Sequence, residues 1–170
     1  MVDVPERYNA SLLLDRNMEA GLGDKVAISC GDEKITYREL LRRVSRFGAA
    51  LKGMGARREE RVVLVLNDSP AFPVAFFGAI RAGCVPVPSN PLLKAEDQRY
   101  FIVDSYARVV VVDHEYYETV QKALDGHPEQ VAVIVANGSA PGATALSDLL
   151  RTGPDTLPPA DTHRDDMAFM

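Results

Sequence analysis

Short apolar runs that are rich in valine recur along the middle of the chain. These runs do not alternate with polar residues, and charged or polar positions border them. A strand that is buried on both faces of a parallel sheet has this pattern, because neither face meets water. We therefore predict four strands of one parallel sheet, at Arg61–Asn67, Cys84–Pro88, Arg108–Asp113 and Gln130–Ala136.

Amphipathic segments lie between these runs. Tyr37–Met54 places its apolar residues on one stripe and most of its arginines off it, as a helix that packs on a core does. Strand, helix and strand at this spacing indicate right-handed βαβ units. We therefore predict an α/β fold, a layered βαβ domain around a mainly parallel sheet. Three further helices are expected at Ser69–Ala82, Lys94–Ser105 and Glu115–Leu124.

Local signals add detail to this outline. Lys25–Ile35 has apolar stretches on both sides of Gly31, which is typical of a β-hairpin with a tight turn. Thr36 follows, and Glu39 comes three residues later. This spacing predicts a capping box, in which each side chain bonds the other residue's backbone amide. Gly83 is expected to end the preceding helix in the left-handed conformation.

Composition divides the chain into three regions. Residues 1–24 form an N-terminal arm with a short helix, residues 25–136 form the α/β sheet subdomain, and residues 137–170 form a connection that ends in a strand. The stretch from 137 to 165 is rich in small and turn-forming residues, so we expect it to be mostly loop. The 170 residues, 46% of them hydrophobic, suffice for a domain with its own core.

Charge and cysteine content exclude several classes of function. The net charge of −5 argues against nucleic-acid binding, because phosphate contacts need clustered positive charge. No apolar run approaches the roughly 20 residues of a membrane-spanning helix, and the first residues do not read as a secretory signal. Two cysteines do not indicate a disulfide framework, and Cys84 is expected to be a buried apolar filler. We therefore expect a cytoplasmic protein without nucleic-acid or membrane partners.

The residues alone do not make up a complete active site. Gly138–Gly142 follows a strand, as a phosphate loop would, but it has no lysine and is predicted to be a plain loop. His114 is interpreted as a helix-start residue beside an aspartate cap, Asp113. Neighbouring Asp165 and Asp166 would point to opposite faces and are interpreted as the start of a strand. We predict no catalytic residue and no metal ligand, since the histidines lack ligand spacing: His114, His127 and His163.

The order of several motifs resembles the adenylate-forming enzymes, which include acyl-CoA synthetases, luciferases and the adenylation domains of peptide synthetases. Ile35–Leu40 resembles the first core motif of this family. Phe77–Gly83 followed by Cys84–Pro91 resembles the second motif. Asp104–Asp113 resembles the helix-to-strand junction that comes next, and Asp165–Met170 resembles the strand that leads into the family's phosphate loop.

A narrower similarity concerns benzoate–CoA ligases and related aryl-CoA ligases. It implies ATP, Mg²⁺ and CoA as cofactors, benzoate or a similar aryl carboxylate as substrate, and an acyl-AMP intermediate before the thioester. Some relatives carry a basic residue directly after the Asn-Pro of the second motif, where it can approach the CoA phosphate. Here that position is Leu92, and the nearest base, Lys94, is the candidate for a CoA contact. The similar stretches are Arg58–Arg61, Pro73–Gly83 and Pro86–Leu93.

The resemblance also implies that the chain is an N-terminal fragment. Family members are much longer, and their phosphate loop, aryl pocket, ribose-binding aspartate and C-terminal lid with its catalytic lysine would follow Met170. We expect this portion alone to be inactive, to bind none of these cofactors, and to self-associate through an exposed apolar face. Two alternatives stay open. The chain is a stand-alone α/β binding or interaction module, or the parent is an acyl-CoA synthetase for another acid, such as coumarate or a fatty acid.

Overall fold

The central sheet consists of the valine-rich runs and one further short strand. The computed structural model describes residues 4–126 and 131–170. Neighbouring strands of this five-stranded sheet are parallel, in the order β4-β3-β5-β6-β7. The predicted α/β fold with a mainly parallel sheet is therefore confirmed. The strands are β3 (Arg61–Val65), β4 (Val85–Pro88), β5 (Ala107–Asp113), β6 (Ala132–Ala136) and β7 (Thr144–Ala145).

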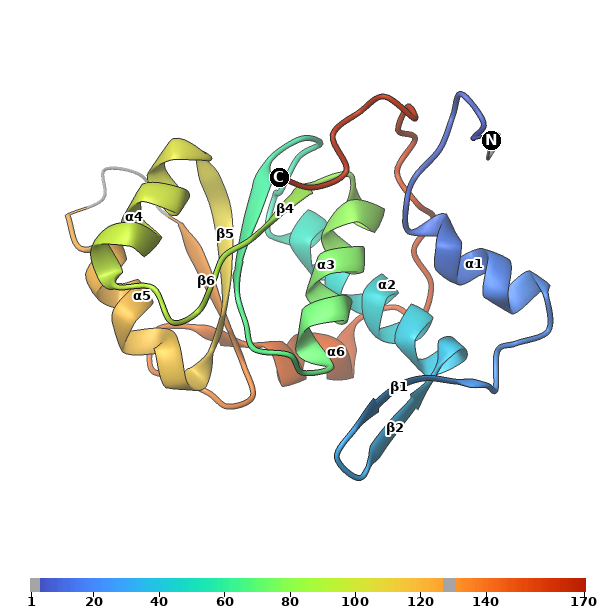
Figure 1. The fold of residues 1–170 in the computed structure, drawn as a ribbon, viewed down its shortest axis with the longest axis horizontal. Helices are drawn as coiled ribbons and strands as arrows, with labels where there is room; N and C mark the ends of the chain where they lie inside the picture. The colour runs from blue at the N-terminus through green and yellow to red at the C-terminus, as the bar shows by residue number, and fades with distance from the viewer. Residues whose placement is uncertain (1–3, 127–130) are drawn as a thin grey trace.

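Helices cover both faces of the sheet, with α4 and α5 on one side and α2 and α3 on the other (Figure 1). Val62 and Val109 point into the core beneath α2 and α3, whereas Val63 and Val110 point into the core beneath α4 and α5. All four side chains are buried. Burial on both faces explains why these runs do not alternate. The helices are α2 (Tyr37–Gly53), α3 (Ala71–Ala82), α4 (Ala95–Asp104), α5 (Tyr117–Leu124) and α6 (Leu146–Thr152).

Two glycines set the distance between α2 and α3. A Cβ atom on Gly48 would lie 2.9 Å from the carbonyl oxygen of Gly78 and 2.7 Å from Leu157 Cδ2. A Cβ atom on Gly78 would lie 2.6 Å from Phe47 Cδ1. Any larger residue would therefore push the two helices apart. Gly83 ends α3 with a φ of 87°, which confirms the predicted left-handed helix end.

The N-terminal part consists of α1 (Leu12–Glu19) and an antiparallel hairpin of β1 (Val26–Cys30) and β2 (Glu33–Thr36). The Thr36 hydroxyl accepts a hydrogen bond from Glu39 N at 3.2 Å, so the Thr36 half of the predicted capping box is confirmed. The Glu39 carboxylate instead accepts hydrogen bonds from Arg42 Nε and Arg43 Nε, each at 2.7 Å. The charged side chains on the first turns of α2 thus compete with the second half of the box.

The structure departs from the sequence predictions mainly after β6. The stretch expected to be mostly loop contains β7 and α6, and Leu146 of α6 is buried against the sheet. A 3-10 turn, His114–Tyr116, precedes α5. The strand predicted from Gln130 is found as β6, and Gln130 itself lies outside the described residues. Within the described part of the chain, no helix is long and apolar enough to cross a bilayer.

Candidate functional site

At the carboxyl ends of β3 and β5, the chain connections to the next strands lead toward opposite edges of the sheet. The chain leaves β3 through α3 and reaches β4 on one side, whereas it leaves β5 through α5 and reaches β6 on the other. The two helices cover opposite faces of the sheet, so their connections diverge at this edge. Ligands of open α/β sheets bind outside the carboxyl ends of the strands at such a point. A ligand site is therefore expected at this edge.

Asp113, the last residue of β5, is the buried centre of this edge. Its carboxylate accepts hydrogen bonds from Asn67 N at 2.8 Å and from Asn137 Nδ2 at 2.6 Å. These bonds join the segments that come after β3, β5 and β6. Asn67 is held in turn by the Tyr116 hydroxyl, at 3.2 Å, and by Glu115. His114 begins the 3-10 turn and Asp113 occupies its N-cap position, as expected, but the Asp113 side chain makes no capping hydrogen bond and ties strand ends together instead.

A pocket of about 210 Å³ opens at this edge, between the hairpin, α3 and α6. Arg43 and Asn137 are among its lining residues. Arg43 Nη1 pairs with Glu33 at 3.0 Å, and its Nε donates to Glu39. Hydrogen bonds from Arg42 and Arg43 hold the pKa of Glu39 below its ordinary value, against the opposing effect of burial. Because two carboxylates already neutralise the arginine of this pocket, it is poorly suited to binding a phosphate.

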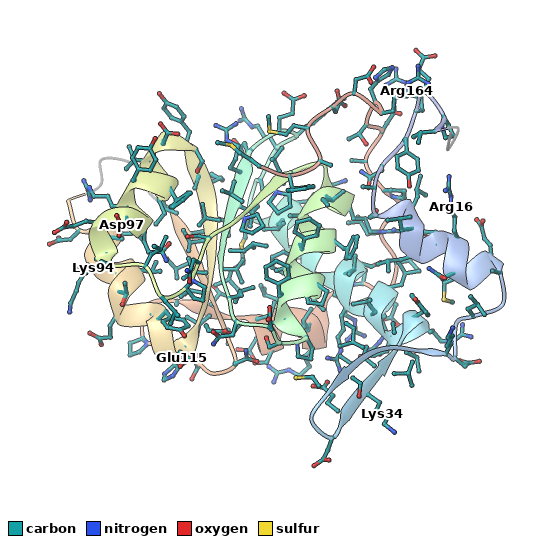
Figure 2. The ribbon with its side chains drawn as sticks, viewed as in Figure 1. Arg16, Lys34, Lys94, Asp97, Glu115 and Arg164 are labelled. Atoms are coloured by element: carbon teal, nitrogen blue, oxygen red, sulfur yellow. The ribbon has the colours of Figure 1, made fainter. Side chains whose placement is uncertain are left out.

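Lys94 precedes the first residue of α4, and it lies at the left of Figure 2, near Asp97. Its side chain is exposed, and its carbonyl oxygen accepts a hydrogen bond from Gln98 N at 3.0 Å. Gln98 is fully buried, donates to the Asn90 carbonyl oxygen at 2.9 Å and bonds Ser89 Oγ at 2.9 Å. These bonds fix the loop of the second motif beside Lys94. A CoA contact by Lys94 stays a prediction.

His114 and His163, the two histidines among the described residues, do not assemble into a metal site. His114 packs against Gly138, where an added Cβ atom would lie 2.8 Å from His114 Cβ. His163 lies near the chain's end, with its Nδ1 atom 3.3 Å from Asp165. His127 lies outside the described residues. Across residues 4–126 and 131–170, no three histidine, cysteine, aspartate or glutamate side chains are placed to hold a metal ion.

Asp165 and Asp166 lie in a turn, so the prediction that they start a strand is wrong. Asp166 N donates to the His163 carbonyl oxygen at 3.0 Å. The Asp166 carboxylate accepts from His163 N at 2.7 Å and from the Arg58 guanidinium. The hydrogen bond from His163 N and the nearby Arg58 charge lower the pKa of Asp166. The aspartate thus closes a turn and docks it on the loop between α2 and β3.

Residues 160–170, which include this turn, follow the chain from the end of α3 to β4, and Figure 1 shows the C-terminus beside β4. Ala160 N donates to the Arg81 carbonyl oxygen at 2.8 Å, and Met170 N donates to the Pro86 carbonyl oxygen at 3.1 Å. The segment therefore advances in the same direction as the chain that leads from α3 into β4. Met170 occupies the place where a further parallel strand would join the β4 edge of the sheet.

Apolar side chains of this last segment are exposed to solvent. Met167, Phe169 and Met170 are all more than half exposed, although the Phe169 ring lies 5.6 Å from the ring of Phe76 on α3. They extend the aromatic surface of α3 beyond the sheet. An apolar face through which the chain self-associates stays a prediction, and these three residues are the candidates for it.

Arg81, which the sequence patterns did not single out, is a buried charge on α3. Its side chain is 6% exposed and pairs with both carboxylate oxygens of Asp15, at 2.7 and 3.0 Å. Arg81 Nε also donates to the Leu157 carbonyl oxygen. The residue thus fastens α1 and the C-terminal connection to α3. The available signal was a charged residue that comes directly after a long apolar run.

Comparisons with known proteins agree with the motif order. The family described as AMP-binding enzymes matches residues 14–170. The chain is 40% identical over 164 residues to the 4-hydroxybenzoate–CoA/benzoate–CoA ligase of Rhodopseudomonas palustris, covering 95% of this chain and 30% of the relative. It is 38% identical over 170 residues to the benzoate–CoA ligase of Thauera aromatica, covering 99% of this chain and 32% of the relative. The chain thus spans less than a third of the length of these relatives.

Solved structures give the same result for the fold. A benzoate CoA ligase from Burkholderia xenovorans LB400 superposes with a TM-score of 0.86 at 35% identity, covering 95% of this chain and 32% of that chain. An anthranilate CoA ligase in complex with anthranoyl-AMP superposes with a TM-score of 0.92 at 33% identity, covering 96% of this chain and 32% of that chain.

Proposed function

The chain belongs to the family of AMP-binding enzymes, and from this premise we propose that it is the N-terminal portion of an aryl-carboxylate–CoA ligase acting on benzoate or a close analogue. The observation that carries the proposal is the identity of 38–40% to two ligases named for benzoate, over at least 95% of the chain. A long-chain-fatty-acid–CoA ligase of Escherichia coli is 29% identical over 90% of the chain, which favours the aryl substrate.

The proposed reaction has two steps. A carboxylate oxygen attacks the α-phosphorus of ATP and expels pyrophosphate, which leaves an acyl-AMP. The CoA thiol, losing its proton, then attacks the acyl carbon and expels AMP, which leaves the thioester. Adenylation supplies the leaving group that a free carboxylate lacks. Such phosphate chemistry requires positioned cations and backbone donors around the phosphates.

The described residues of this chain do not match those requirements. No group of three or more histidine, cysteine, aspartate or glutamate side chains among them is placed to hold a metal ion, and we propose none of them as a Mg²⁺ ligand. The arginine of the carboxyl-edge pocket is already paired with Glu33 and Glu39. We therefore assign no chemical step to residues of this chain, and we expect the chain alone to be inactive.

The proposed role of this chain is to position the catalytic parts of the ligase. Met170 N already bonds the Pro86 carbonyl oxygen at the β4 edge. A chain that continued from Met170 as a strand would run parallel to β4 and emerge at the carboxyl edge of the sheet. A phosphate loop after that strand would then lie at the edge that Asp113 braces. The exposed Phe169 and Met170 would be covered by the rest of such a ligase.

The test is a thioester assay on the protein isolated from its source. We expect ATP-dependent formation of benzoyl-CoA, with benzoate or a hydroxybenzoate preferred over palmitate. The 170-residue chain expressed alone is the control, and it should not catalyse benzoate-dependent exchange of pyrophosphate into ATP. Preference for palmitate would support a fatty-acid ligase. Absence of any acyl-CoA formation would support the stand-alone module.

A further inference from the structure

Asn137 and Gly138 form the bend that follows β6, at the carboxyl edge of the sheet. Both residues are exposed. An asparagine that precedes a glycine is prone to deamidation, because the glycine has no side chain to shield its backbone nitrogen from the asparagine side chain. Among the asparagines of this chain, only Asn137 precedes a glycine. Loss of the side-chain amide is one reason why asparagine counts as a thermolabile residue.

The nucleophile of this reaction, the Gly138 backbone nitrogen, is available. Its N–H has no hydrogen-bond partner among residues 4–126 and 131–170. Packing also requires a glycine at this position, since an added Cβ atom would lie 2.8 Å from His114 Cβ. The close approach of His114 thus keeps an unshielded backbone nitrogen directly after Asn137.

The Asn137 side chain is held by its nitrogen atom and not by its carbonyl group. Asn137 Nδ2 donates to Asp113 Oδ1 at 2.6 Å and to Ser69 Oγ at 3.2 Å. Its Oδ1 atom accepts no hydrogen bond from the described part of the chain. Asn137 also lies outside the helices and strands, so its backbone can rotate toward the geometry of attack without breaking a ladder of hydrogen bonds.

The other asparagines lack this combination of features. Asn90 precedes Pro91, which has no N–H group to react. Asn17 lies within α1, where helical hydrogen bonds fix the backbone. Asn9 is buried, and hydrogen bonds at the carboxyl edge hold both the backbone nitrogen and the side chain of Asn67. The structure therefore singles out Asn137.

We propose that Asn137 is a site of spontaneous deamidation and that the reaction releases the loop of residues 137–143 from Asp113. The Gly138 nitrogen attacks the side-chain carbonyl carbon of Asn137 and forms a succinimide ring. The bond from that carbon to Nδ2 breaks, and Nδ2 leaves as ammonia with the proton that the Gly138 nitrogen loses. Water then opens the ring at either carbonyl and leaves aspartate or isoaspartate. The reaction does not depend on the proposed ligase function.

The product places a carboxylate where an amide now donates. Asp113 is only 2% exposed, and its Oδ1 atom lies 2.6 Å from Asn137 Nδ2. Two carboxylates this close cannot both stay ionised, and the exposed one at position 137 can turn into water instead. The bonds to Asp113 and Ser69 are then lost, whereas the bond from Asn67 N to Asp113 remains. The segments after β3 and β5 thus stay joined, and the segment after β6 is released.

The first test is incubation of the folded chain at mildly alkaline pH, followed by protease digestion and peptide mass spectrometry. We expect the mass change of an amide nitrogen replaced by oxygen to appear first in the peptide that contains Asn137. Asn137→Ser should lose this change. A parallel sample in urea shows the rate that the sequence alone allows.

Two results of this test would overturn the proposal. One is conversion of Asn137 in urea but none in the folded chain, because the hydrogen bonds to Nδ2 would then protect the amide. The other is earlier conversion of a different asparagine in the folded chain.

A matched pair of variants tests the consequence. Asn137→Asp carries the carboxylate of the product, whereas Ser139→Asp adds the same charge at an exposed residue of the same loop. We expect Asn137→Asp to lower the urea midpoint of unfolding, and Ser139→Asp to leave it unchanged. Equal midpoints for the two variants would contradict the release of the loop from Asp113.

Discussion

The close contact between α2 and α3 gives a quantitative prediction for Gly48→Ala. Replacing glycine by alanine inside a helix stabilises it by about 1 kcal/mol when the added methyl group meets nothing. At Gly48 the methyl carbon would lie 2.9 Å from the Gly78 carbonyl oxygen. A backbone oxygen cannot move aside by changing a rotamer, so the helices must separate. Overpacking of this kind costs about 1–3 kcal/mol.

Gly53→Ala is the matched control, since Gly53 ends the same helix and an added Cβ atom there meets nothing within 4 Å. We expect Gly53→Ala to be neutral or stabilising by up to about 1 kcal/mol. Gly48→Ala should then be less stable than Gly53→Ala by about 1–3 kcal/mol. Urea unfolding followed by circular dichroism measures the difference, provided that the m-value is unchanged. Equal stability of the two variants would refute the close helix contact.

Three further predictions concern single side chains. The pKa of Glu39 is lower in the folded protein than its ordinary value of 4.5. The carboxylate therefore stabilises the fold above pH 4.5, and this stabilisation is lost as the pH falls through the lower folded-state pKa. Glu39→Gln should flatten the pH dependence of the unfolding free energy in that acidic range. Burial raises the pKa of the Cys84 thiol to about 11. At a pH of about 7.5, a thiol reagent should therefore modify exposed Cys30 rapidly and Cys84 only after unfolding. Two fast-reacting thiols would contradict this prediction. Asp113→Ala leaves Asn67 N without its acceptor, whereas Asn137 Nδ2 keeps its bond to Ser69 Oγ; the unfolding free energy should fall by about 1–3 kcal/mol, and an unchanged urea midpoint would argue against the brace.

The sheet could be predicted because burial on both faces leaves a clear record in the sequence. In β5, Val109 to Val112 are all at most 1% exposed, which favours a continuous apolar run. The end of α3 was equally predictable, since Gly83 has the positive φ that favours glycine. In both cases the cause lies within a few residues of the signal.

Features that depend on distant partners could not be predicted. Asp113 accepts from Asn67 and Asn137, which meet it only after three strands have come together. Arg81 and Asp15 pair across 66 residues of sequence. The prediction that the Glu39 carboxylate bonds the Thr36 amide was wrong for a local reason. Two arginines on the next turn of α2 bind the Glu39 carboxylate instead.

The missed helix α6 shows a different difficulty. It has only seven residues, in a stretch whose glycine, proline and serine content indicates loop. Its stability comes from packing, since Leu146 is buried and Leu149 and Leu150 lie against the same core. Composition averaged over the stretch therefore conceals a short helix that tertiary contacts stabilise.

We propose that this chain is the first part of an aryl-CoA ligase. The most direct test is the intact mass of the protein captured from its source with an antibody raised against this chain. We expect a polypeptide much larger than 18.6 kDa, because the chain covers only 30% of the Rhodopseudomonas palustris ligase that it resembles. A native polypeptide of 18.6 kDa, with no larger product, would contradict it.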